Sequence, residues 1–285
     1  MTLRVGLIGK PLTRRHSQVM HNAAFAAAGI DARYELLELE PDAVEHAVTE
    51  ARGSGWLGLG VTAPYKRLVA GLCDTVDPDA TTIGAVNNVV RTEEGKLVGF
   101  NTDAPGFRAG AELAMGRPLA DAIVVVAGAG GAAHAVVFAC LSAGARRVTI
   151  GNRTLSSAAQ LADRFGGVAT GSLSAVALGR SAFTTALWTA DLAVNATTVG
   201  MLEGGVTIEV EQLPPGATVF DVVYVPSETP LLRAARARGL RAANGSEMLI
   251  QQASFAFERW TGVGGMAEVM RAAVAPLLAD ATARA

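Results

Sequence analysis

The chain of 285 residues has few charged side chains, few aromatic ones and only two cysteines. Charged residues make up 18% of it, and 26 acidic residues face 24 Lys and Arg, so the basic excess typical of a nucleic-acid-binding protein is missing. Cys73 and Cys140 lie in apolar stretches without the spacing of metal ligands, which predicts two free thiols and no metal site. Half of the residues are hydrophobic, enough to build a sizeable core.

No stretch of the sequence predicts a membrane segment or a secretory signal. The N-terminal apolar run, "LRVGLIG", is too short for a signal peptide and lacks a small-residue cleavage site. Residues 122–145 carry no Asp, Glu, Lys or Arg, but the glycines in "IVVVAGAGGAAHAVVFACLSAG" divide this segment into a buried strand, a turn and a helix. We therefore expect a cytoplasmic protein, monomeric or homodimeric, that binds neither membrane nor nucleic acid.

Strand patterns alternate with helix patterns along most of the chain, which favours an α/β fold with parallel sheets. The alternation falls into two blocks, with a hairpin signal at Glu94-Gly95 before the second. We expect a two-domain protein with a cleft between the domains. The first is an α/β substrate domain, residues 1–104, joined by the C-terminal helices at 247–285; the second is a Rossmann-like dinucleotide-binding domain, residues 105–246.

A glycine-rich turn is the first chemical signal. In "GAGGA", Gly128, Ala129, Gly130 and Gly131 stand between a strand and a helix, where bare backbone and helix N–H groups can bind a pyrophosphate. About twenty residues on, "GNRT" places Asn152, Arg153 and Thr154 where an NAD-selective site usually has an acidic residue. An arginine and a hydroxyl suit a 2′-phosphate, so we expect NADP, with NAD as the alternative.

The second signal is a set of polar residues next to apolar strands. Lys66 follows "GVTAPY", Asn87 stands in "GAVNN", and Thr102 and Asp103 stand in "GFNTD". A lysine can exchange a proton with a reacting hydroxyl, and a neighbouring carboxylate can orient it. Beside a dinucleotide fold, these residues indicate oxidation of an alcohol.

Eight motifs between residues 58 and 262 resemble those of the shikimate dehydrogenase family, in the family's order: "GVTAPYK", "GAVNN", "GFNTD", "GAGGA", "GNRT", "VNATTVGM", "FDVVYVPSETPLL" and "NGSEMLIQQASFAFERWTG". The resemblance implies hydride transfer between NADP and a ring hydroxyl of a cyclohexene carboxylate. It implies that Lys66 and Asp103 are catalytic. It implies substrate-binding roles for Thr62, Asn87, Thr102, Tyr224 and Gln252. It implies cofactor-binding roles for Gly128, Gly130, Gly131, Asn152, Arg153, Thr154, Thr197, Gly245 and Met248.

The chain departs from the family pattern at the substrate end. Two family hydroxyls near the N-terminus bind the substrate carboxylate; Ser17 keeps the second, whereas Arg15 replaces the first. An arginine can bind a carboxylate by bidentate, charge-assisted hydrogen bonds, so we expect Arg15 and Ser17 to contact the acid and Arg14 to face solvent. Gly60 stands where the family usually has Asn, and Ser157 where many NADP-using members have a second arginine. We interpret the chain as a divergent paralogue acting on shikimate or a relative such as quinate or aminoshikimate.

Two alternatives remain open from the sequence. Methylene-tetrahydrofolate dehydrogenases have a related two-domain build, but their lysine lies in a Tyr-x-x-x-Lys pattern, whereas Tyr65 directly precedes Lys66. A non-catalytic metabolite sensor could keep the same fold, although the retention of Lys66 and Asp103 counts against it.

Overall fold

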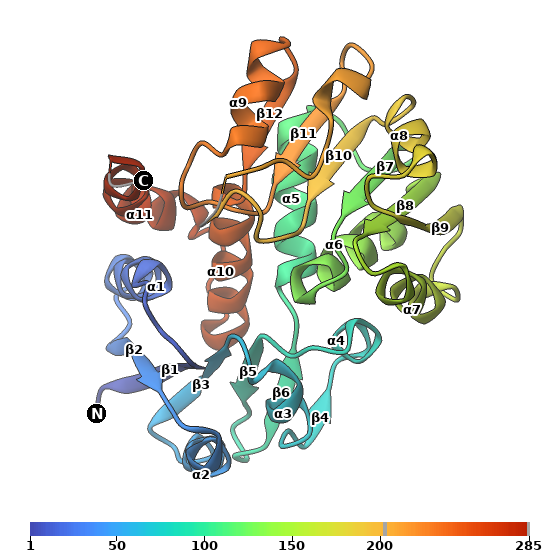
Figure 1. Cartoon of the computed structure of the whole chain (residues 1–285). Helices are drawn as coiled ribbons and strands as arrows, with labels where there is room; N and C mark the ends of the chain where they lie inside the picture. The colour runs from blue at the N-terminus through green and yellow to red at the C-terminus, as the bar shows by residue number, and fades with distance from the viewer. Residues whose placement is uncertain (202–203, 284–285) are drawn as a thin grey trace. The chain divides into compact units, whose positions relative to one another are not determined.

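The computed structural model describes residues 1–201 and 204–283, which form two compact α/β units (Figure 1). The first unit comprises Met1–Thr102 and Ile250–Leu277; the second comprises Asp103–Leu249 and the described chain from Leu278 onward. This agrees with the predicted two-part α/β fold. The boundaries lie a few residues from the predicted ones, and the end of the last helix groups with the second unit instead of the first.

The first unit contains a six-stranded sheet of order β2-β1-β3-β5-β6-β4. Its strands are β1 (Leu3–Gly9), β2 (Ala32–Glu38), β3 (Trp56–Val61), β4 (Thr75–Val76), β5 (Asn88–Arg91) and β6 (Leu97–Phe100). The sheet is mixed, not wholly parallel as expected, because β5 runs antiparallel to both β3 and β6. The predicted hairpin signal explains this: Gly95 has φ +80 in the turn that joins β5 to β6.

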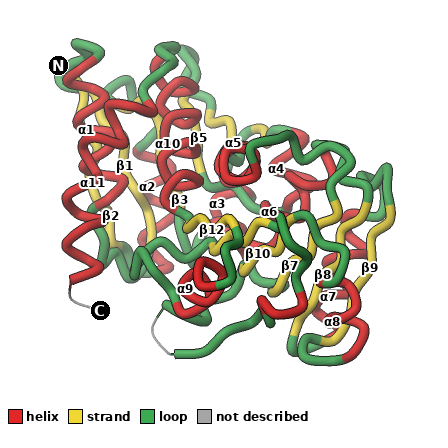
Figure 2. Tube along the Cα trace, turned by 90° about the horizontal axis from the view of Figure 1, so that it is seen from above, coloured by secondary structure: helices red, strands yellow, loops and turns green. Residues whose placement is uncertain are grey.

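Helices cover both faces of this sheet: α1 (His16–Ala27), η1 (Pro41–Ala43), α2 (Val44–Glu50), α3 (Lys66–Ala70), α4 (Pro78–Ile83), the later part of α10 (Ser246–Thr261) and the first part of α11 (Ala267–Ala283). Figure 2 shows α1 and α10 side by side over the strands. Aromatic side chains join them: the Phe25 and Phe257 ring centroids are 5.0 Å apart, and His21 and Trp260 are also 5.0 Å apart. The opposite face buries Ile8, Leu59 and Val61 against α2.

Two glycines of β3 make the aromatic packing on the α1 face possible. A Cβ at Gly58 would lie 2.7 Å from Nε1 of Trp260, which donates a hydrogen bond of 2.9 Å to the carbonyl of Val89. The indole ring therefore lies directly against the backbone of β3, where no side chain could stand. The second glycine, Gly60, makes room for the hydroxyl of Tyr34 in the same way.

The second unit contains a wholly parallel six-stranded sheet of order β12-β11-β10-β7-β8-β9, the doubly wound arrangement typical of dinucleotide-binding domains. Its strands are β7 (Ile123–Ala127), β8 (Arg147–Asn152), β9 (Ser172–Ala177), β10 (Leu192–Asn195), β11 (Thr218–Asp221) and β12 (Arg241–Asn244). Its helices are α5 (Asp103–Met115), α6 (Gly131–Ser142), α7 (Leu155–Phe165), α8 (Ser181–Leu187), η2 (Val210–Gln212) and α9 (Pro230–Ala237).

The apolar segment at residues 122–145 folds as predicted, into strand β7, a glycine turn and helix α6. All five residues of β7 are buried, and α6 ends just before Gly144, whose φ of +82 suits glycine beyond a helix C-terminus. Among the described residues, no helix is long and apolar enough to cross a membrane. Cys140, within α6, is a free thiol whose pKa burial raises to about 12, and Cys73 is also free.

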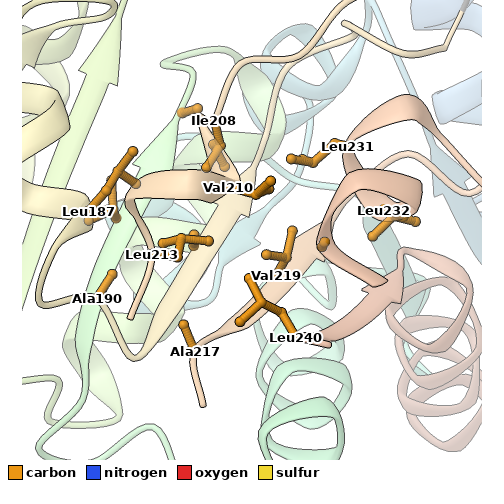
Figure 3. Packing of buried hydrophobic residues seen from close by; sticks show 14 of the residues in the cluster. Leu187, Ala190, Ile208, Val210, Leu213, Ala217, Val219, Leu231, Leu232 and Leu240 are labelled. Carbon is orange, nitrogen blue, oxygen red and sulfur yellow. The ribbon is translucent and has the colours of Figure 1, made fainter. Parts of the chain in front are cut away.

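An aliphatic core fills one side of the second sheet. Figure 3 shows leucines of α8 and α9, such as Leu187 and Leu231, converging with Val219 of β11. The sequence did not predict the two edge strands, β9 and β12. Among the described strands, each pairs with one neighbour; β9 contains mostly Ser and Ala and β12 reads Arg-Ala-Ala-Asn, so neither shows the β-branched pattern of a buried strand.

Candidate active site

The glycine turn of the second unit leaves room for a ligand. Gly128 has φ +116, and a Cβ there would lie 2.9 Å from the carbonyl oxygen of Ala196, so only glycine fits. A Cβ at Gly130 or Gly131 would meet no atom within 4 Å, although α6 begins at this point. Open space above the first N–H groups of a helix suits a pyrophosphate, so these residues fit a dinucleotide.

The "GNRT" segment lies next to this turn. The N–H of Gly128 donates a hydrogen bond of 2.7 Å to the carbonyl of Gly151, which joins the ends of β7 and β8. Beyond it, Asn152 donates to the carbonyl of Thr154 across 3.0 Å, while the side chains of Arg153 and Thr154 are exposed. The structure thus brings the two predicted parts of the cofactor site together at one edge of the sheet.

The remaining predicted cofactor residues follow strands β10 and β12. Thr197 is partly buried, and its hydroxyl donates a hydrogen bond of 2.7 Å to Oδ1 of Asn195. The N–H of Gly245 donates to the carbonyl of Val223 across 3.2 Å, and a Cβ at Gly245 would lie 2.1 Å from the carbonyl oxygen of Val222. Met248 is buried in the first turn of α10. Their contact with a cofactor stays a prediction.

In the first unit, three predicted substrate-binding residues form one hydrogen-bonded cluster. Asn87 Oδ1 accepts from the backbone N–H of Thr102 across 2.8 Å, and Asn87 Nδ2 donates to Thr102 Oγ1 across 3.2 Å. Thr102 Oγ1 also donates to Gln252 Oε1 across 3.3 Å. Residues 150 positions apart in the chain therefore meet here.

Asn88 also belongs to this cluster, although the sequence did not predict a role for it. Its Nδ2 donates to Asn87 Oδ1 across 2.9 Å and to Thr102 Oγ1 across 2.8 Å, and its side chain is buried. A second asparagine directly after Asn87, at the start of a strand whose next two residues are valines, was the available signal. Buried amides need such partners, so Asn88 holds the orientation of Asn87 and Thr102.

Lys66 lies close to the cluster in the fold of the first unit. It begins α3, is half-buried, and its carbonyl accepts a hydrogen bond of 3.2 Å from the N–H of Val86, directly before Asn87. Thr62 follows β3, and its N–H donates to the carbonyl of Ile8 across 2.9 Å. Asp103 begins α5 of the second unit and directly follows Thr102. The pairing of Lys66 with Asp103 stays a prediction.

The two arginines before α1 have different surroundings. Arg15 is exposed, and its Nε donates a hydrogen bond of 3.1 Å to Oε1 of Gln18. Arg14 is the more enclosed of the two and lies near His16, whose pKa is lowered by burial and further by the charge of Arg14. Ser17 is half-buried in the first turn of the helix. The contact of Arg15 and Ser17 with a substrate stays a prediction.

Tyr34 occupies the space beside Gly60. A Cβ at Gly60 would lie 2.5 Å from the Tyr34 hydroxyl oxygen, so the asparagine usual in the family would not fit without a shift. Tyr34 cannot move easily, because its ring stacks on His21 with centroids 4.5 Å apart and its backbone exchanges two hydrogen bonds with the side chain of Asn22. The departure at Gly60 is therefore matched by a tyrosine that fills the vacated volume.

Among the described residues, no group of three or more His, Cys, Asp or Glu side chains could hold a metal ion. The features that the structure offers for chemistry are the lysine, the amide cluster and the glycine turn. A doubly wound parallel sheet with this turn, linked to a second α/β unit that bears a lysine and buried amides, defines the class: a nicotinamide-dinucleotide-dependent oxidoreductase.

Three family descriptions match the chain: "Shikimate dehydrogenase substrate binding domain" at residues 7–89, "Shikimate / quinate 5-dehydrogenase" at residues 111–200 and "Shikimate 5'-dehydrogenase C-terminal domain" at residues 245–275. Shikimate dehydrogenase (NADP(+)) of Rubrobacter xylanophilus is 42% identical over 275 residues, which cover 96% of this chain and 95% of that protein. The chain belongs to the shikimate dehydrogenase family.

Solved structures agree with this. Shikimate 5-dehydrogenase of Thermus thermophilus in complex with NADP(H) and shikimate superposes with a TM-score of 0.82 and 36% identity, covering 95% of this chain and 99% of that one. Ligand-free 5-ketofructose reductase of a Gluconobacter species gives a TM-score of 0.88 and 32% identity, covering 97% and 99%. These similarities confirm the predicted enzyme class and favour neither alternative that the sequence left open.

Proposed function

We propose that the protein catalyses the reversible, NADP-dependent oxidation of a ring hydroxyl of shikimate or a close relative such as quinate. The observation that carries the proposal is the cluster of Asn87, Thr102 and Gln252 in the same unit as Lys66. The amide and hydroxyl side chains of this cluster can hydrogen-bond the several hydroxyls of a polyhydroxylated ring. Each of these side chains can both donate and accept a hydrogen bond.

The proposed mechanism assigns the proton to Lys66. The bound cofactor supplies the hydride acceptor for the carbon that bears the hydroxyl. Lys66 takes the proton from the hydroxyl oxygen in oxidation and returns it in reduction, while Asp103 orients the lysine and the hydroxyl. Thr62, Asn87, Thr102, Tyr224 and Gln252 hold the ring in place, and Arg15 with Ser17 binds the carboxylate.

The cofactor preference rests on the exposed side chains of Arg153 and Thr154 beside the glycine turn. A guanidinium and a hydroxyl at the end of β8 can bind the 2′-phosphate of NADP, and no carboxylate stands at residues 152–154 to hold the free ribose hydroxyl of NAD. Gly128, Ala129, Gly130 and Gly131 bind the pyrophosphate, and Asn152 supports the loop.

A substrate panel tests the proposal. Shikimate, quinate and an aminoshikimate are oxidised, and 3-dehydroshikimate and 5-ketofructose reduced, each with NADP(H) and NAD(H), while the absorbance of the reduced cofactor is followed. We expect the highest kcat/KM for a cyclic carboxylate with NADP(H). Turnover of 5-ketofructose alone would replace the proposed substrate class, and no turnover of any member would favour the sensor alternative. The same preparation, passed over a sizing column, tests the expected monomer or homodimer.

A further inference from the structure

Asp221, at the end of β11, is a fully buried carboxylate that the proposed mechanism does not use. Three donors surround it: Asn195 Nδ2 at 2.8 Å, the N–H of Val223 at 3.1 Å and the hydroxyl of Thr229 at 2.6 Å. A buried carboxylate is costly unless such bonds satisfy it, and an ionised carboxylate only accepts. It therefore dictates which way each of its partners points.

The first consequence concerns Asn195. With its Nδ2 turned to Asp221, its Oδ1 faces the loop after β10, where it accepts from the N–H of Thr197 at 3.2 Å, the Thr197 hydroxyl at 2.7 Å and the Thr207 hydroxyl at 3.1 Å. Nδ2 also donates to the carbonyl of Val199 across 3.1 Å. Asp221 thus fixes the orientation of the Asn195 amide, and that amide in turn fixes the position of Thr197.

The second consequence concerns the loops after β11 and β12. Val223 donates its N–H to Asp221 and accepts a hydrogen bond of 3.2 Å from the N–H of Gly245 at its carbonyl. Tyr224 is the next residue. One carboxylate is therefore connected, through one or two hydrogen bonds, to the segments that follow β10, β11 and β12.

Each hydrogen bond to Asp221 begins one arm of the network, and the third arm, through Thr229, leads away from the predicted site residues. Thr229 is the N-cap of α9, and its hydroxyl accepts from the N–H of Leu232 at 3.4 Å while it donates to Asp221. This arm stabilises the start of a helix whose leucines pack into the aliphatic core. It provides a comparison within the same network, because it shares the carboxylate but carries no predicted site residue.

The sheet order places these arms relative to a bound dinucleotide. The glycine turn follows β7 and the Arg153 loop follows β8, whereas β10, β11 and β12 lie on the other side of β7. A dinucleotide with its pyrophosphate at β7 and its adenosine end at β8 extends its nicotinamide half toward the ends of β10 to β12. We propose that Asp221 is a positioning residue that, through Asn195 and Val223, fixes the loops that hold the nicotinamide half. This inference rests on the proposed function.

The experiment compares two ligands on matched variants. NADP contacts both halves of the site, whereas adenosine 2′,5′-bisphosphate has no nicotinamide half, and calorimetry gives the Kd of each. In Asn195→Ala and Asp221→Ala, we expect binding of NADP to weaken by about 3- to 10-fold more than that of the bisphosphate. Asp221→Asn keeps an acceptor oxygen for Asn195 and should restore the wild-type ratio of the two Kd values. Thr229→Val should lower Tm and leave that ratio unchanged.

If Asp221 had a merely structural role, the variants would weaken the binding of NADP and of the bisphosphate by the same factor, or Thr229→Val would change the ratio of the two Kd values as Asn195→Ala does. Either result overturns the inference. If Asp221→Ala does not fold, the comparison of Asn195→Ala with Thr229→Val decides. Failure of the proposed function looks different: a wild-type protein that binds NADP with the expected variant pattern but turns over no substrate refutes the reaction and leaves the positioning role standing. A wild-type protein that binds no dinucleotide overturns both.

Discussion

The two units bury different kinds of polar group. The first unit gathers neutral amides and hydroxyls, those of Asn87, Asn88, Thr102 and Gln252, and covers the neighbouring strands with aromatic rings of α1 and α10. The second unit buries the carboxylate of Asp221 beside an aliphatic core. Neutral groups can exchange partners with a substrate, whereas a carboxylate that only accepts commits its partners to one arrangement.

This difference between the polar groups of the two units predicts that each unit has a separate function, which mutagenesis can test. If the first unit supplies the substrate site and the proton, with Asp103 and Tyr224 as the exceptions, and the second supplies the cofactor site, then a change at any other site residue of one unit should leave the other unit's ligand unaffected. A charge added among the aromatic rings of α1 and α10 should destabilise the first unit, and loss of the acceptor oxygens of Asp221 should loosen the loops of the second.

The largest effect is expected for Lys66→Met. Loss of a general acid–base group lowers kcat by about 10² to 10⁴-fold. Because the lysine belongs to the first unit, the Kd for NADP, measured by calorimetry, should stay within about twofold of wild type. Arg67→Met, at the exposed neighbouring position, serves as the control and should keep wild-type kcat. Turnover near the wild-type rate in Lys66→Met would remove this lysine from the mechanism.

A smaller effect is expected for Arg153→Ala in the second unit. A hydrogen bond to a charged group contributes about 1.5–3 kcal/mol, or roughly 10- to 100-fold in affinity, and we expect the lower end because Ser157 supplies no second cation. The Kd for NADP should rise accordingly, while the Kd for NAD and the KM for the substrate stay unchanged. Arg147→Ala, at the exposed opposite end of β8, is the matched control. A wild-type preference for NAD would show that the interpretation of "GNRT" is wrong.

The aromatic face of the first unit predicts a pH dependence of stability. Burial lowers the pKa of His21 to about 3 from 6.5, so the folded protein keeps this ring neutral while the unfolded chain takes up a proton below about pH 6.5. The free energy of unfolding therefore keeps its full value with respect to His21 above that pH. It decreases as the pH falls from there toward about 3. The loss amounts to about 2 kcal/mol at about pH 5, and the lowered pKa of His16 acts in the same direction.

Urea unfolding of His21→Phe at about pH 8 and about pH 5 isolates this contribution from that of the other titrating groups. The variant should lose about 2 kcal/mol less than wild type between the two conditions. His46→Gln, at an exposed position, should lose as much as wild type. Equal losses in all three proteins would mean that His21 takes up its proton without unfolding.

Sequence reasoning succeeded where the signal is local. The buried strand β7, the glycine turn and α6 follow one another within about twenty residues, and each part has its own pattern of β-branched, glycine or small residues. The edge strands β9 and β12 carry no such pattern, because an edge strand buries less and its neighbours in the sheet determine its conformation.

The site residues also fall into those that a local sequence motif predicts and those that it does not. Asn87, Thr102 and Gln252 could be predicted because they stand in motifs that resemble those of a known family. Asn195 and Asp221 stand in such motifs too, yet their roles depend on a contact across 26 positions that no local pattern reveals. The available signal was a polar residue that ends an apolar strand, as in "DLAVN" and "TVFD". The link between Gly60 and Tyr34 also joins separate strands, so the sequence showed the missing side chain but not what replaced it.

The smallest predicted effect is the coupling between Gly60 and Tyr34, about 1 kcal/mol. In Gly60→Ala, the new methyl group would stand 2.5 Å from the Tyr34 hydroxyl oxygen and 3.2 Å from Cδ1 of Leu7, so we expect a loss of about 1–3 kcal/mol of unfolding free energy from overpacking. Tyr34→Phe removes the hydroxyl, and Gly60→Ala should then cost about 1 kcal/mol less. Urea unfolding of the four proteins of this cycle measures the coupling. Gly167→Ala, where a Cβ would meet nothing within 4 Å, controls for the loss of a glycine. Additive effects would mean that the strand shifts to admit a side chain at residue 60, and that the tyrosine does not fix the shape of this part of the first unit.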